Sequence, residues 1–551
     1  MSIRETLCKN KMPTASATTI NLLVSAFLAS VANLPLWRTA AAKLGMQHPG
    51  QWLFIGVAML VLWMAFNLLF SLLSIRQLHK PLLVTLLCVA AICSYYMQSY
   101  GIVIDKQMIT NLLETDVREA SEQITWQLFV HVAMLGILPS LLLLRTRITY
   151  RPWRQELLLR GKVVLASLLV LLALVFAEFK DFVLFGRENK MLRMYVNPTY
   201  PIYSMTKTVT KGFRRNGSAP PAVIGADARR PNSATRSAVV LVVGETARAE
   251  QFSLNGYSRP TNPELARRNV ITYDDVQACG TDTAESLPCM FFHQGKANYS
   301  RNEAKKYENL LDVLQRTGVR VIWRDNNSGS KGVGDRVIFE DLANAKDPNL
   351  CASGECYDEI LLGGLDRLLA ENRGDLLIVL HQKGSHGPSY YKRTPKEFKR
   401  FLPECTNDNV QDCDRQSIVN AYDNTILYTD HLLSMVIDKL KSQSYATAML
   451  YVSDHGESLG ENNIYLHGLP YVIAPQQQTR IPMIFWASDR FLRDKGIDRN
   501  ALANHRTEHV SHDNLFHSML GLFNVATSLY QTELNLFRPV PSVAAAPLGQ
   551  P

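Results

Sequence analysis

Four apolar, strand-like runs in the second half of the chain each end at side chains that bind metals or phosphate. The runs are Ala238–Val243, Val319–Trp323, Leu376–Leu380 and Ala446–Val452. The polar residues that follow them include Glu245, Asp325, Asn327, His381, His386, Asp454 and His455. Ligands bind outside the carboxyl ends of the strands in an open parallel sheet, so we expect one site that gathers these residues.

Asp454 and His455 follow a strongly apolar run and offer the oxygen and nitrogen ligands that Zn²⁺ accepts. A lone Asp-His pair is weak evidence, because many strands end in polar turns. Glu245 strengthens the interpretation, since it ends a second buried strand in Val-Val-Gly-Glu-Thr. The alternative for Glu245 is a carboxylate at a helix N-terminus, where the helix dipole favours negative charge. Together the three residues predict a metal site.

The segment between Cys279 and Cys289 offers three hydroxyl groups, on Thr281, Thr283 and Ser286. A threonine hydroxyl is a poor nucleophile until a metal or a base lowers its pKa. If this loop faces the metal, one hydroxyl can become a metal-bound alkoxide, and composition does not choose among the three. The alternative is a loop hydroxyl that bonds to nearby backbone.

Two further histidines and a Gly-rich loop could bind a phosphate. His386 and His467 each precede a glycine, which indicates turns rather than core, whereas His381 is interpreted as a structural residue on its strand. Lys331 and Asn327 lie in a loop whose spacing does not match a P-loop. They can hold a phosphate by charge and hydrogen bond, but a solvated lysine on a surface loop is an equal alternative.

Six of the nine cysteines fall into three close pairs. The pairs are Cys279/Cys289, Cys351/Cys356 and Cys405/Cys413. Six cysteines allow fifteen pairings, but short loops favour the sequential one. Disulfides require an oxidising compartment such as a bacterial periplasm. A zinc cluster is the alternative, and it lacks any Cys-x-x-Cys spacing.

The first third of the 551-residue chain contains five apolar stretches long enough to span a bilayer. They are Ile20–Leu36, Trp52–Ile75, Pro81–Met97, Trp126–Leu144 and Val163–Phe179. The basic flanks fall on one side, which places the N-terminus in the cytoplasm and everything after Phe179 outside. Much of the net charge of +9 lies in a basic cluster before the fifth stretch, which suits an anionic membrane face rather than nucleic acid. The cluster consists of Arg145, Arg147, Arg151, Arg154, Arg160 and Lys162. The first stretch could instead be a cleavable signal, with the same orientation.

The second half alternates strands with helical patterns, which is typical of a mainly parallel sheet with helices on both faces. The helical patterns lie at Leu310–Thr317, Tyr357–Glu371 and Ser417–Lys441. We therefore expect a five-helix transmembrane domain at residues 1–180 and an interfacial bridging segment and linker at 181–237. An α/β, zinc-dependent catalytic domain should follow at 238–551, in the periplasm.

These motifs resemble those of the bacterial lipid A phosphoethanolamine transferases, which include polymyxin-resistance enzymes. The matching motifs are Val-Gly-Glu-Thr-Ala-Arg, Cys-Gly-Thr-x-Thr-Ala, Trp-Arg-Asp-Asn-Asn, His-Gly-Pro and Ser-Asp-His-Gly-Glu-Ser-Leu-Gly-Glu. The resemblance covers the whole chain and implies an alkaline-phosphatase/sulfatase-like catalytic domain. It implies one tightly bound Zn²⁺, with Thr283 as both ligand and nucleophile. The implied ligands are Glu245, Thr283, Asp454 and His455. The residues implied to contact a second zinc or the substrate phosphate are His386, His467, Lys331 and Asn327.

The resemblance implies an activity at the bacterial inner membrane. Phosphoethanolamine would pass from phosphatidylethanolamine to a lipid A phosphate through a covalent threonine intermediate, which would lower the negative charge of the outer membrane. A monomer with no nucleic-acid partner is expected. The alternatives are another acceptor (a lipopolysaccharide core sugar or a glucan), a phosphoglycerol transferase, or a sulfatase-like hydrolase, whose modified nucleophile motif is absent. A transporter or scaffold is disfavoured, because the spans carry few ionisable residues.

The loop between the third and fourth spans carries Asn111, Thr115 and Glu119 at a spacing of four residues. On a helix over Ile109–Ala120 this spacing lines them along one face. The resemblance implies that they bind the donor lipid, with Glu119 facing the ethanolamine ammonium. The alternative is a solvated polar face on a short amphipathic helix.

Overall fold

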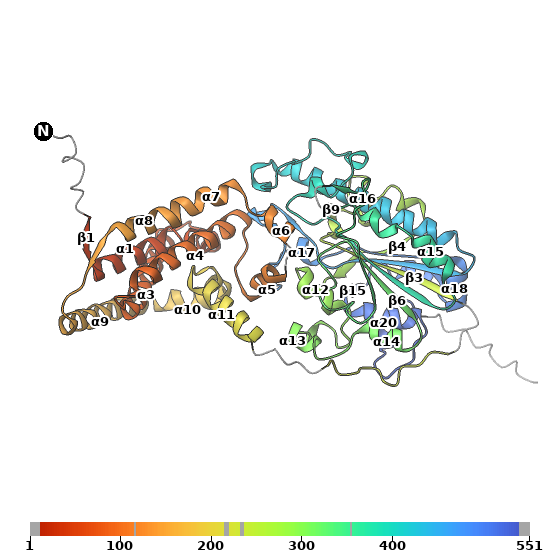
Figure 1. The fold of residues 1–551 in the computed structure, drawn as a ribbon, viewed down its shortest axis with the longest axis horizontal. Coiled ribbons are helices and arrows are strands. Elements are labelled where there is room, and N and C mark those ends of the chain that lie inside the picture. The colour runs from red at the N-terminus through yellow and green to blue at the C-terminus, as the bar shows by residue number, and fades with distance from the viewer. Residues whose placement is uncertain (1–11, 115–116, 214–219, 232–235, 353–354, 539–551) are drawn as a thin grey trace, which may run out of the picture. The chain divides into compact units, whose positions relative to one another are not determined.

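The computed structural model of the chain describes residues 12–114, 117–213, 220–231, 236–352 and 355–538. It divides into two compact units. The first comprises Met1–Ile109 and Ile124–Arg214, and the second comprises Thr110–Gln123 and Arg215–Pro551 (Figure 1). Residues 110–123, in the loop between the third and fourth predicted spans, therefore group with the second unit.

Four helices of the first unit are long and apolar enough to cross a membrane. They are α3 (Pro49–Leu73), α4 (His79–Tyr100), the helical stretch Trp126–Arg145 and α9 (Trp153–Ala177). The stretch Trp126–Arg145 consists of α7 (Trp126–Val132), a π-helical turn (Ala133–Ile137) and α8 (Leu138–Arg145). Large apolar side chains such as Trp126 and Phe176 are exposed on these helices, as expected where lipid replaces water.

The predicted first span, Ile20–Leu36, is not one straight helix. It corresponds to α1 (Ala17–Ser30) and α2 (Leu34–Leu44), whose axes differ by 48°. Pro35 at the start of α2 has no N–H to continue the α1 hydrogen bonding. The Asn33 side chain donates instead to the Leu28 carbonyl, at 2.8 Å. The pair counts as a fifth span only if the bent helices cross the membrane together.

The helix at the fifth predicted span, Val163–Phe179, begins earlier in the sequence than predicted. Helix α9 starts at Trp153, so Arg154, Arg160 and Lys162 of the basic cluster lie within the helix rather than in a loop. Long basic side chains can extend from a helix end to the membrane interface, so charge near the end does not stop the helix. The remaining elements of this unit are β1 (Thr14–Ser16), β2 (Arg147–Thr149), α10 (Phe179–Glu188) and α11 (Thr199–Phe213).

The second unit is built on a seven-stranded sheet with the order β4-β14-β11-β3-β10-β6-β7. The bounds are β4 (Ile271–Tyr273), β14 (Met483–Ala487), β11 (Ala446–Ser453), β3 (Ser237–Gly244), β10 (Leu376–His381), β6 (Arg320–Asp325) and β7 (Ile338–Asp341). The five strands from β11 to β7 are mutually parallel, and β14 pairs antiparallel with both of its neighbours. The four predicted runs correspond to β3, β6, β10 and β11, and the prediction that they are parallel is confirmed.

Helices cover both faces of this sheet (Figure 1). Alternate residues of β3 enter two separate cores. On one side the core includes side chains of α14 (Leu310–Arg316), α18 (Asp489–Lys495) and α20 (Asp513–Leu522). On the other it includes side chains of α15 (Leu365–Glu371) and α16 (Arg415–Lys441). Because both faces are covered, every residue of β3 and β11 is buried.

Two helical predictions need correction. The pattern at Tyr357–Glu371 is a 3-10 turn (Asp358–Leu362) followed by α15, because Gly364 between them adopts a φ of +71° that a helix does not accommodate. The helix expected over Ile109–Ala120 is two helices, α5 (Lys106–Glu114) and α6 (Val117–Glu122). Thr115 lies outside the described residues.

Shorter elements complete the second unit. The helices are α12 (Thr283–Met290), α13 (Arg301–Ala304), α17 (Gln476–Thr479) and α19 (Arg499–Asn504). Three two-stranded sheets pair β5 (Asp275–Gln277) with β15 (His509–Ser511), β8 (Cys351–Ala352) with β9 (Glu355–Cys356), and β12 (Ser458–Leu459) with β13 (Tyr465–Leu466).

Candidate active site

The carboxyl ends of β3 and β11 bring three potential metal ligands together. The two strands are parallel neighbours, and Gly244 is in register with Ser453. The residues that follow, Glu245 and Asp454, therefore leave the sheet at the same level. Ligand atoms of Glu245, Asp454 and His455 lie within 4.8 Å of one another, and all three side chains are fully buried.

Thr283 is the loop hydroxyl that faces this cluster. It is the first residue of α12, and its Oγ1 donates to Glu245, 3.1 Å from Oε1 and 3.0 Å from Oε2. The same Oγ1 lies 3.5 Å from Nε2 of His455. The other two hydroxyls are engaged with backbone, since Thr281 donates to the Leu469 carbonyl and Ser286 to the Asp454 carbonyl. Geometry thus separates Thr283 from two residues that composition left equivalent.

The ends of β6 and β10 supply groups that orient Glu245. The Asn327 side-chain amide donates to Glu245 Oε2 at 2.7 Å and to the Gln382 carbonyl at 2.8 Å. Nε2 of His381 lies 3.3 Å from the same amide nitrogen. Nδ1 of His381 lies 2.8 Å from a carboxylate oxygen of Asp325. His381 is thus a buried structural residue at the edge of the site, as its position on the strand suggested.

The donor set fits a metal ion. Within the described parts of the chain, Oδ2 of the buried Asp454 accepts no hydrogen bond, although Oδ1 accepts the His455 backbone N–H at 2.7 Å. Nδ1 of His455 donates to the Gly456 carbonyl at 2.9 Å, so Nε2 is the ring nitrogen directed at Glu245 and Asp454. Two carboxylates, an imidazole and a hydroxyl form a four-ligand set of the kind that binds Zn²⁺.

The electrostatics of the cluster also favour a cation. Burial, together with the charge of Glu245, raises the pKa of Asp454. Burial alone would raise the pKa of Glu245 too, but its contact with His455 holds that pKa below the usual range. Two carboxylates in one buried site repel each other, and a divalent cation between them would offset the repulsion.

His386 and His467 lie beside the cluster. The ring centroid of His467 is 4.5 Å from that of His455 and 5.3 Å from that of His386. Nδ1 of His467 lies 3.4 Å from a carboxylate oxygen of Glu457, which can orient the ring. The Lys331 side chain was predicted to bind phosphate with these two histidines. Its ammonium donates to the hydroxyl and carbonyl of Ser328.

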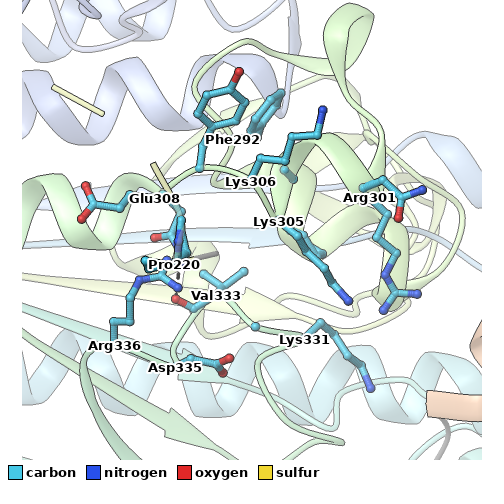
Figure 2. A pocket seen from close by; sticks show the side chains of 17 residues that line it. Pro220, Phe292, Arg301, Lys305, Lys306, Glu308, Lys331, Val333, Asp335 and Arg336 are labelled. Atoms are coloured by element: carbon cyan, nitrogen blue, oxygen red, sulfur yellow. Dashed lines mark hydrogen bonds between the residues drawn. The ribbon is translucent and has the colours of Figure 1, made fainter. Parts of the chain in front are cut away.

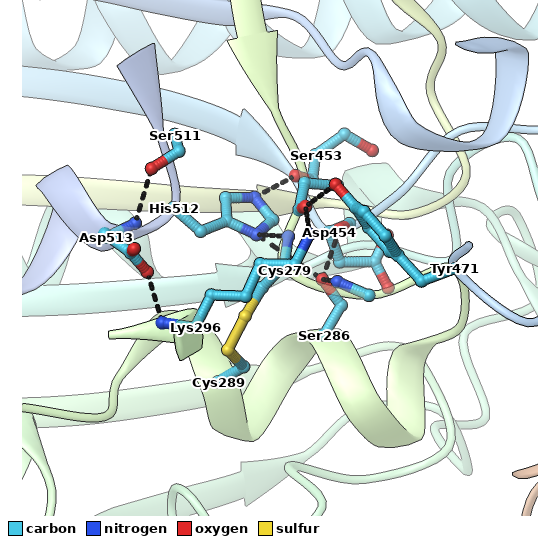
Figure 3. The surroundings of a disulfide bond; sticks show 12 residues. Cys279, Ser286, Cys289, Lys296, Ser453, Asp454, Tyr471, Ser511, His512 and Asp513 are labelled. Atoms are coloured by element: carbon cyan, nitrogen blue, oxygen red, sulfur yellow. Dashed lines mark hydrogen bonds between the residues drawn. A yellow bond between two sulfur atoms is a disulfide. The ribbon is translucent and has the colours of Figure 1, made fainter. Parts of the chain in front are cut away.

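Three disulfides follow the predicted sequential pairing: Cys279–Cys289, Cys351–Cys356 and Cys405–Cys413. The first closes the segment that carries Thr283. Figure 3 shows His512 beside this bridge, a residue that the sequence interpretation missed. Its Nδ1 accepts the Cys279 backbone N–H at 2.9 Å, and its Nε2 donates to the Ser453 carbonyl at 2.9 Å. His512 thus joins the disulfide loop to β11. The only signal in the sequence is a histidine after the short strand β15.

The predicted lipid-binding residues are only partly described. Asn111 lies in α5, Thr115 is outside the described residues, and the Glu119 side chain is outside them as well. Glu122 at the end of α6 is described, and it forms an ion pair with the buried Arg393 at 2.8 Å. This pair fixes the end of the 110–123 loop to the rest of the second unit.

Comparison with known proteins is consistent with this geometry. The sequence profile of the family described as "Phosphoethanolamine transferase EptA/EptB" matches residues 62–213, and the "Sulfatase" profile matches residues 237–525. Phosphoethanolamine transferase EptA of Escherichia coli K12 is 38% identical over 519 residues, which cover 93% of this chain and 94% of the relative. Phosphatidylethanolamine transferase Mcr-1 of Escherichia coli is 40% identical over 520 residues, with coverages of 91% and 94%.

The fold extends the similarity along the whole chain. The structure of the integral membrane protein lipooligosaccharide phosphoethanolamine transferase A from Neisseria meningitidis matches with a TM-score of 0.91 at 35% identity. The match covers 95% of this chain and 99% of that one, so it includes both units. The resemblance inferred from short motifs is confirmed: this chain belongs to the phosphoethanolamine transferase family.

Proposed function

We propose that this enzyme transfers phosphoethanolamine from phosphatidylethanolamine to a phosphate of lipid A, through a covalent intermediate on Thr283. The observation that carries the proposal is the position of Thr283 Oγ1, 3.0 Å from Glu245 and 3.5 Å from His455. A hydroxyl in a buried cluster of metal-ligand type is an activated nucleophile. The names of the relatives give the transferred group, and one of them, 28% identical, is a Kdo(2)-lipid A phosphoethanolamine 7''-transferase.

The first half of the reaction loads the enzyme. Thr283 Oγ1 attacks the phosphorus of phosphatidylethanolamine, the new O–P bond forms, and the bond from phosphorus to the diacylglycerol oxygen breaks. The hydroxyl proton leaves Thr283, and the departing diacylglycerol oxygen takes up a proton. Glu245, which already accepts the hydrogen bond of this hydroxyl, orients the attacking oxygen.

The second half transfers the group. An oxygen of a lipid A phosphate attacks the same phosphorus, the bond to Thr283 breaks, and the threonine oxygen takes up the proton that the attacking phosphate hydroxyl releases. His386 and His467 offset the negative charge that gathers on the phosphoryl oxygens. The product carries an added ammonium group, so the outer membrane attracts cationic peptides such as polymyxin less strongly.

We assign one tightly bound Zn²⁺ to Glu245, Asp454, His455 and Thr283. When bound, Zn²⁺ supplies Lewis-acid chemistry, since it polarises a phosphoryl oxygen and lowers the pKa of the coordinated hydroxyl. The support comes from the Asp454 Oδ2, which accepts no hydrogen bond from the described residues, and from the orientation of His455. We assign a second zinc or the substrate phosphate to His386, His467, Lys331 and Asn327.

We further propose that residues 1–180 form the transmembrane domain in the bacterial inner membrane, that residues 181–237 bridge, and that residues 238–551 act in the periplasm. The protein would act as a monomer with its N-terminus in the cytoplasm. The bias of basic flanks and the three disulfides support this orientation. Asn111, Thr115 and Glu119 would hold the donor headgroup.

Mass spectrometry of lipid A from bacteria that express the protein tests this function. Lipid A should gain the mass of one phosphoethanolamine group, and tandem spectra should place the group on a phosphate. Cells that express Thr283→Ala should not show the gain. If the added mass appears on a core sugar or a glucan, the proposed acceptor is wrong. If the mass increases by a phosphoglycerol group instead, the proposed transferred group is wrong.

A further inference from the structure

A cavity of about 910 Å³ lies in the second unit. Pro288 of α12 lines one part of it, and Lys331 with Gly332 lines another. The same helix carries Thr283, and the same loop carries Asn327, so the cavity is connected to the proposed active site through these two elements. Its size is typical of pockets for ligands much larger than a phosphoethanolamine group.

The lining of this cavity is strongly cationic. Five basic side chains face it against two carboxylates, those of Glu308 and Asp335. The basic residues are Arg301, Lys305, Lys306, Lys331 and Arg336. Glu308 is itself paired with Arg316, so it offsets little of the excess. A concave surface with one sign of charge concentrates ligands of the opposite sign.

Two of the basic side chains form ion pairs with carboxylates that do not line the cavity. Lys306 is paired with Glu303 at 2.6 Å, and Arg336 is paired with Asp312 at 2.6 Å. The cationic ends of Arg301, Lys305 and Lys331 lie on the same side of the cavity in Figure 2, opposite Glu308. Burial lowers the pKa of the Arg301 guanidinium to about 10, so it still carries its charge at neutral pH.

The wall of the cavity suits a sugar. Phe292 is buried and packs against Tyr307, with ring centroids 6.4 Å apart, and both rings line the cavity. Aromatic walls with a few placed polar groups are typical of sites for organic ligands rather than for single ions. An anionic group at the basic end and an apolar face on the aromatic wall together describe a phosphorylated saccharide.

We propose that this cavity binds the phosphorylated sugar headgroup of the acceptor glycolipid, with Arg301 and Lys305 as its anion-binding residues. The inference rests on the proposed transfer to lipid A and names where that acceptor is held. The donor headgroup is a small zwitterion and needs neither the volume nor the excess positive charge. A phosphate held beside Lys331 would lie next to the loop of Asn327, which contacts the Glu245 carboxylate.

The kinetic test uses the full-length enzyme in detergent and the variant Arg301→Gln/Lys305→Gln. Release of diacylglycerol from acyl-labelled phosphatidylethanolamine without acceptor reports the first half-reaction, and transfer to lipid A reports the whole. The variant should raise the KM for lipid A by about tenfold, through loss of two charge-assisted contacts. Diacylglycerol release and zinc content should stay within about twofold of wild type.

Lys441→Gln/Arg493→Gln is the matched control, because it removes two exposed cations of the same domain that do not line the cavity. It should leave the KM for lipid A unchanged. The inference is overturned if the cavity variant keeps a wild-type KM, or if it loses diacylglycerol release as much as transfer. Equal effects of the two double variants would also overturn it, since the result would then reflect net charge.

A binding measurement separates this inference from the proposed function. The wild-type enzyme should bind lipid A more tightly than it binds fully dephosphorylated lipid A. The variant Arg301→Gln/Lys305→Gln should bind the two lipids with similar affinity. This pattern would support the cavity as the binding site for the phosphorylated headgroup even if the enzyme transfers nothing to lipid A. In that case only the proposal that lipid A is the acceptor would be wrong. Equal binding of the two lipids would show an acyl-chain or membrane effect. Displacement of lipid A by an equal concentration of inorganic phosphate would show a simple phosphate site, and either result refutes the proposal.

Discussion

Asn327 donates a hydrogen bond of 2.7 Å to Oε2 of Glu245, although β10 lies between the strands that precede the two residues. The loop after β6 therefore sets the orientation of a carboxylate after β3. The same carboxylate accepts the hydrogen bond of the proposed nucleophile, Thr283. One amide thus influences both the proposed metal site and the attacking oxygen.

Asn327→Ala should weaken zinc binding. Partners that orient a ligand usually contribute about 10- to 100-fold to metal affinity, and we expect a loss in that range. The measurement is the apparent zinc affinity in a competition titration with a chelator, together with the transfer rate at saturating zinc. Asn504→Ala, on the exposed end of α19, is the control. An unchanged zinc affinity in Asn327→Ala would show that the amide does not orient Glu245.

Thr283→Ala should abolish transfer while the domain stays folded. Loss of a covalent nucleophile typically lowers the rate by roughly three orders of magnitude or more. Thr281→Ala and Ser286→Ala are matched controls, because their hydroxyls donate to backbone carbonyls. Each should cost about 1–3 kcal/mol of unfolding free energy by leaving a buried carbonyl without a partner, with transfer largely retained. Wild-type transfer by Thr283→Ala would rule out the covalent route.

The Cys279–Cys289 bridge should stabilise the loop that carries Thr283. Cys279→Ser/Cys289→Ser should lower the unfolding free energy by about 2–3 kcal/mol, as expected for a loop of this length. The transfer rate should fall by more than the loss of folded protein accounts for, since Thr283 is at the start of α12 within the bridged segment. Thermal unfolding and transfer rates of the same preparation would show this. Loss of stability with a wild-type rate would leave the bridge a purely structural role.

Much of the second unit follows from local sequence. The runs at β3 and β11 are continuous and apolar, because both faces of a parallel sheet are covered by helices. That pattern predicted both the strands and the level at which Glu245 and Asp454 emerge. The three disulfides followed from cysteine spacing, since short loops cost little entropy to close.

Features that depend on tertiary contacts did not follow from the sequence. Composition could not choose Thr283 over Thr281, because the choice depends on which hydroxyl reaches Glu245 across 38 residues of chain. The role of His512 depends on a hydrogen bond to Cys279 across 233 residues. The bend between α1 and α2 was also missed, because hydropathy averages over Asn33 and Pro35.

His512 should make stability fall in mild acid. Burial lowers its pKa to about 3, against an ordinary value of 6.5, and the hydrogen bond to the Ser453 carbonyl opposes this shift only in part. The unfolded chain then takes up the proton first, so stability is present above pH 6.5 and falls as the pH drops below it. The slope is at most about 1.4 kcal/mol per pH unit. Denaturant unfolding between pH 7.5 and 5 should show a shallower slope for His512→Gln than for wild type.

His505→Gln is the control for this experiment, since His505 is an exposed histidine of the same unit. It should keep the wild-type slope. If His512→Gln also keeps that slope, the acid sensitivity arises elsewhere in the protein.

Two glutamates of the 110–123 loop should have separable roles. Glu122 is paired with Arg393, and Arg393 is also paired with Glu355, so Glu122→Ala should release the end of α6 and speed limited proteolysis there. Glu119 is proposed to face the ethanolamine ammonium of the donor, so Glu119→Ala should raise the KM for phosphatidylethanolamine by about tenfold. Its zinc content and its proteolysis pattern should match wild type. If Glu119→Ala instead transfers normally in cells, or acts only through faster proteolysis as Glu122→Ala does, the loop is a connector and the donor headgroup is held by the catalytic unit alone.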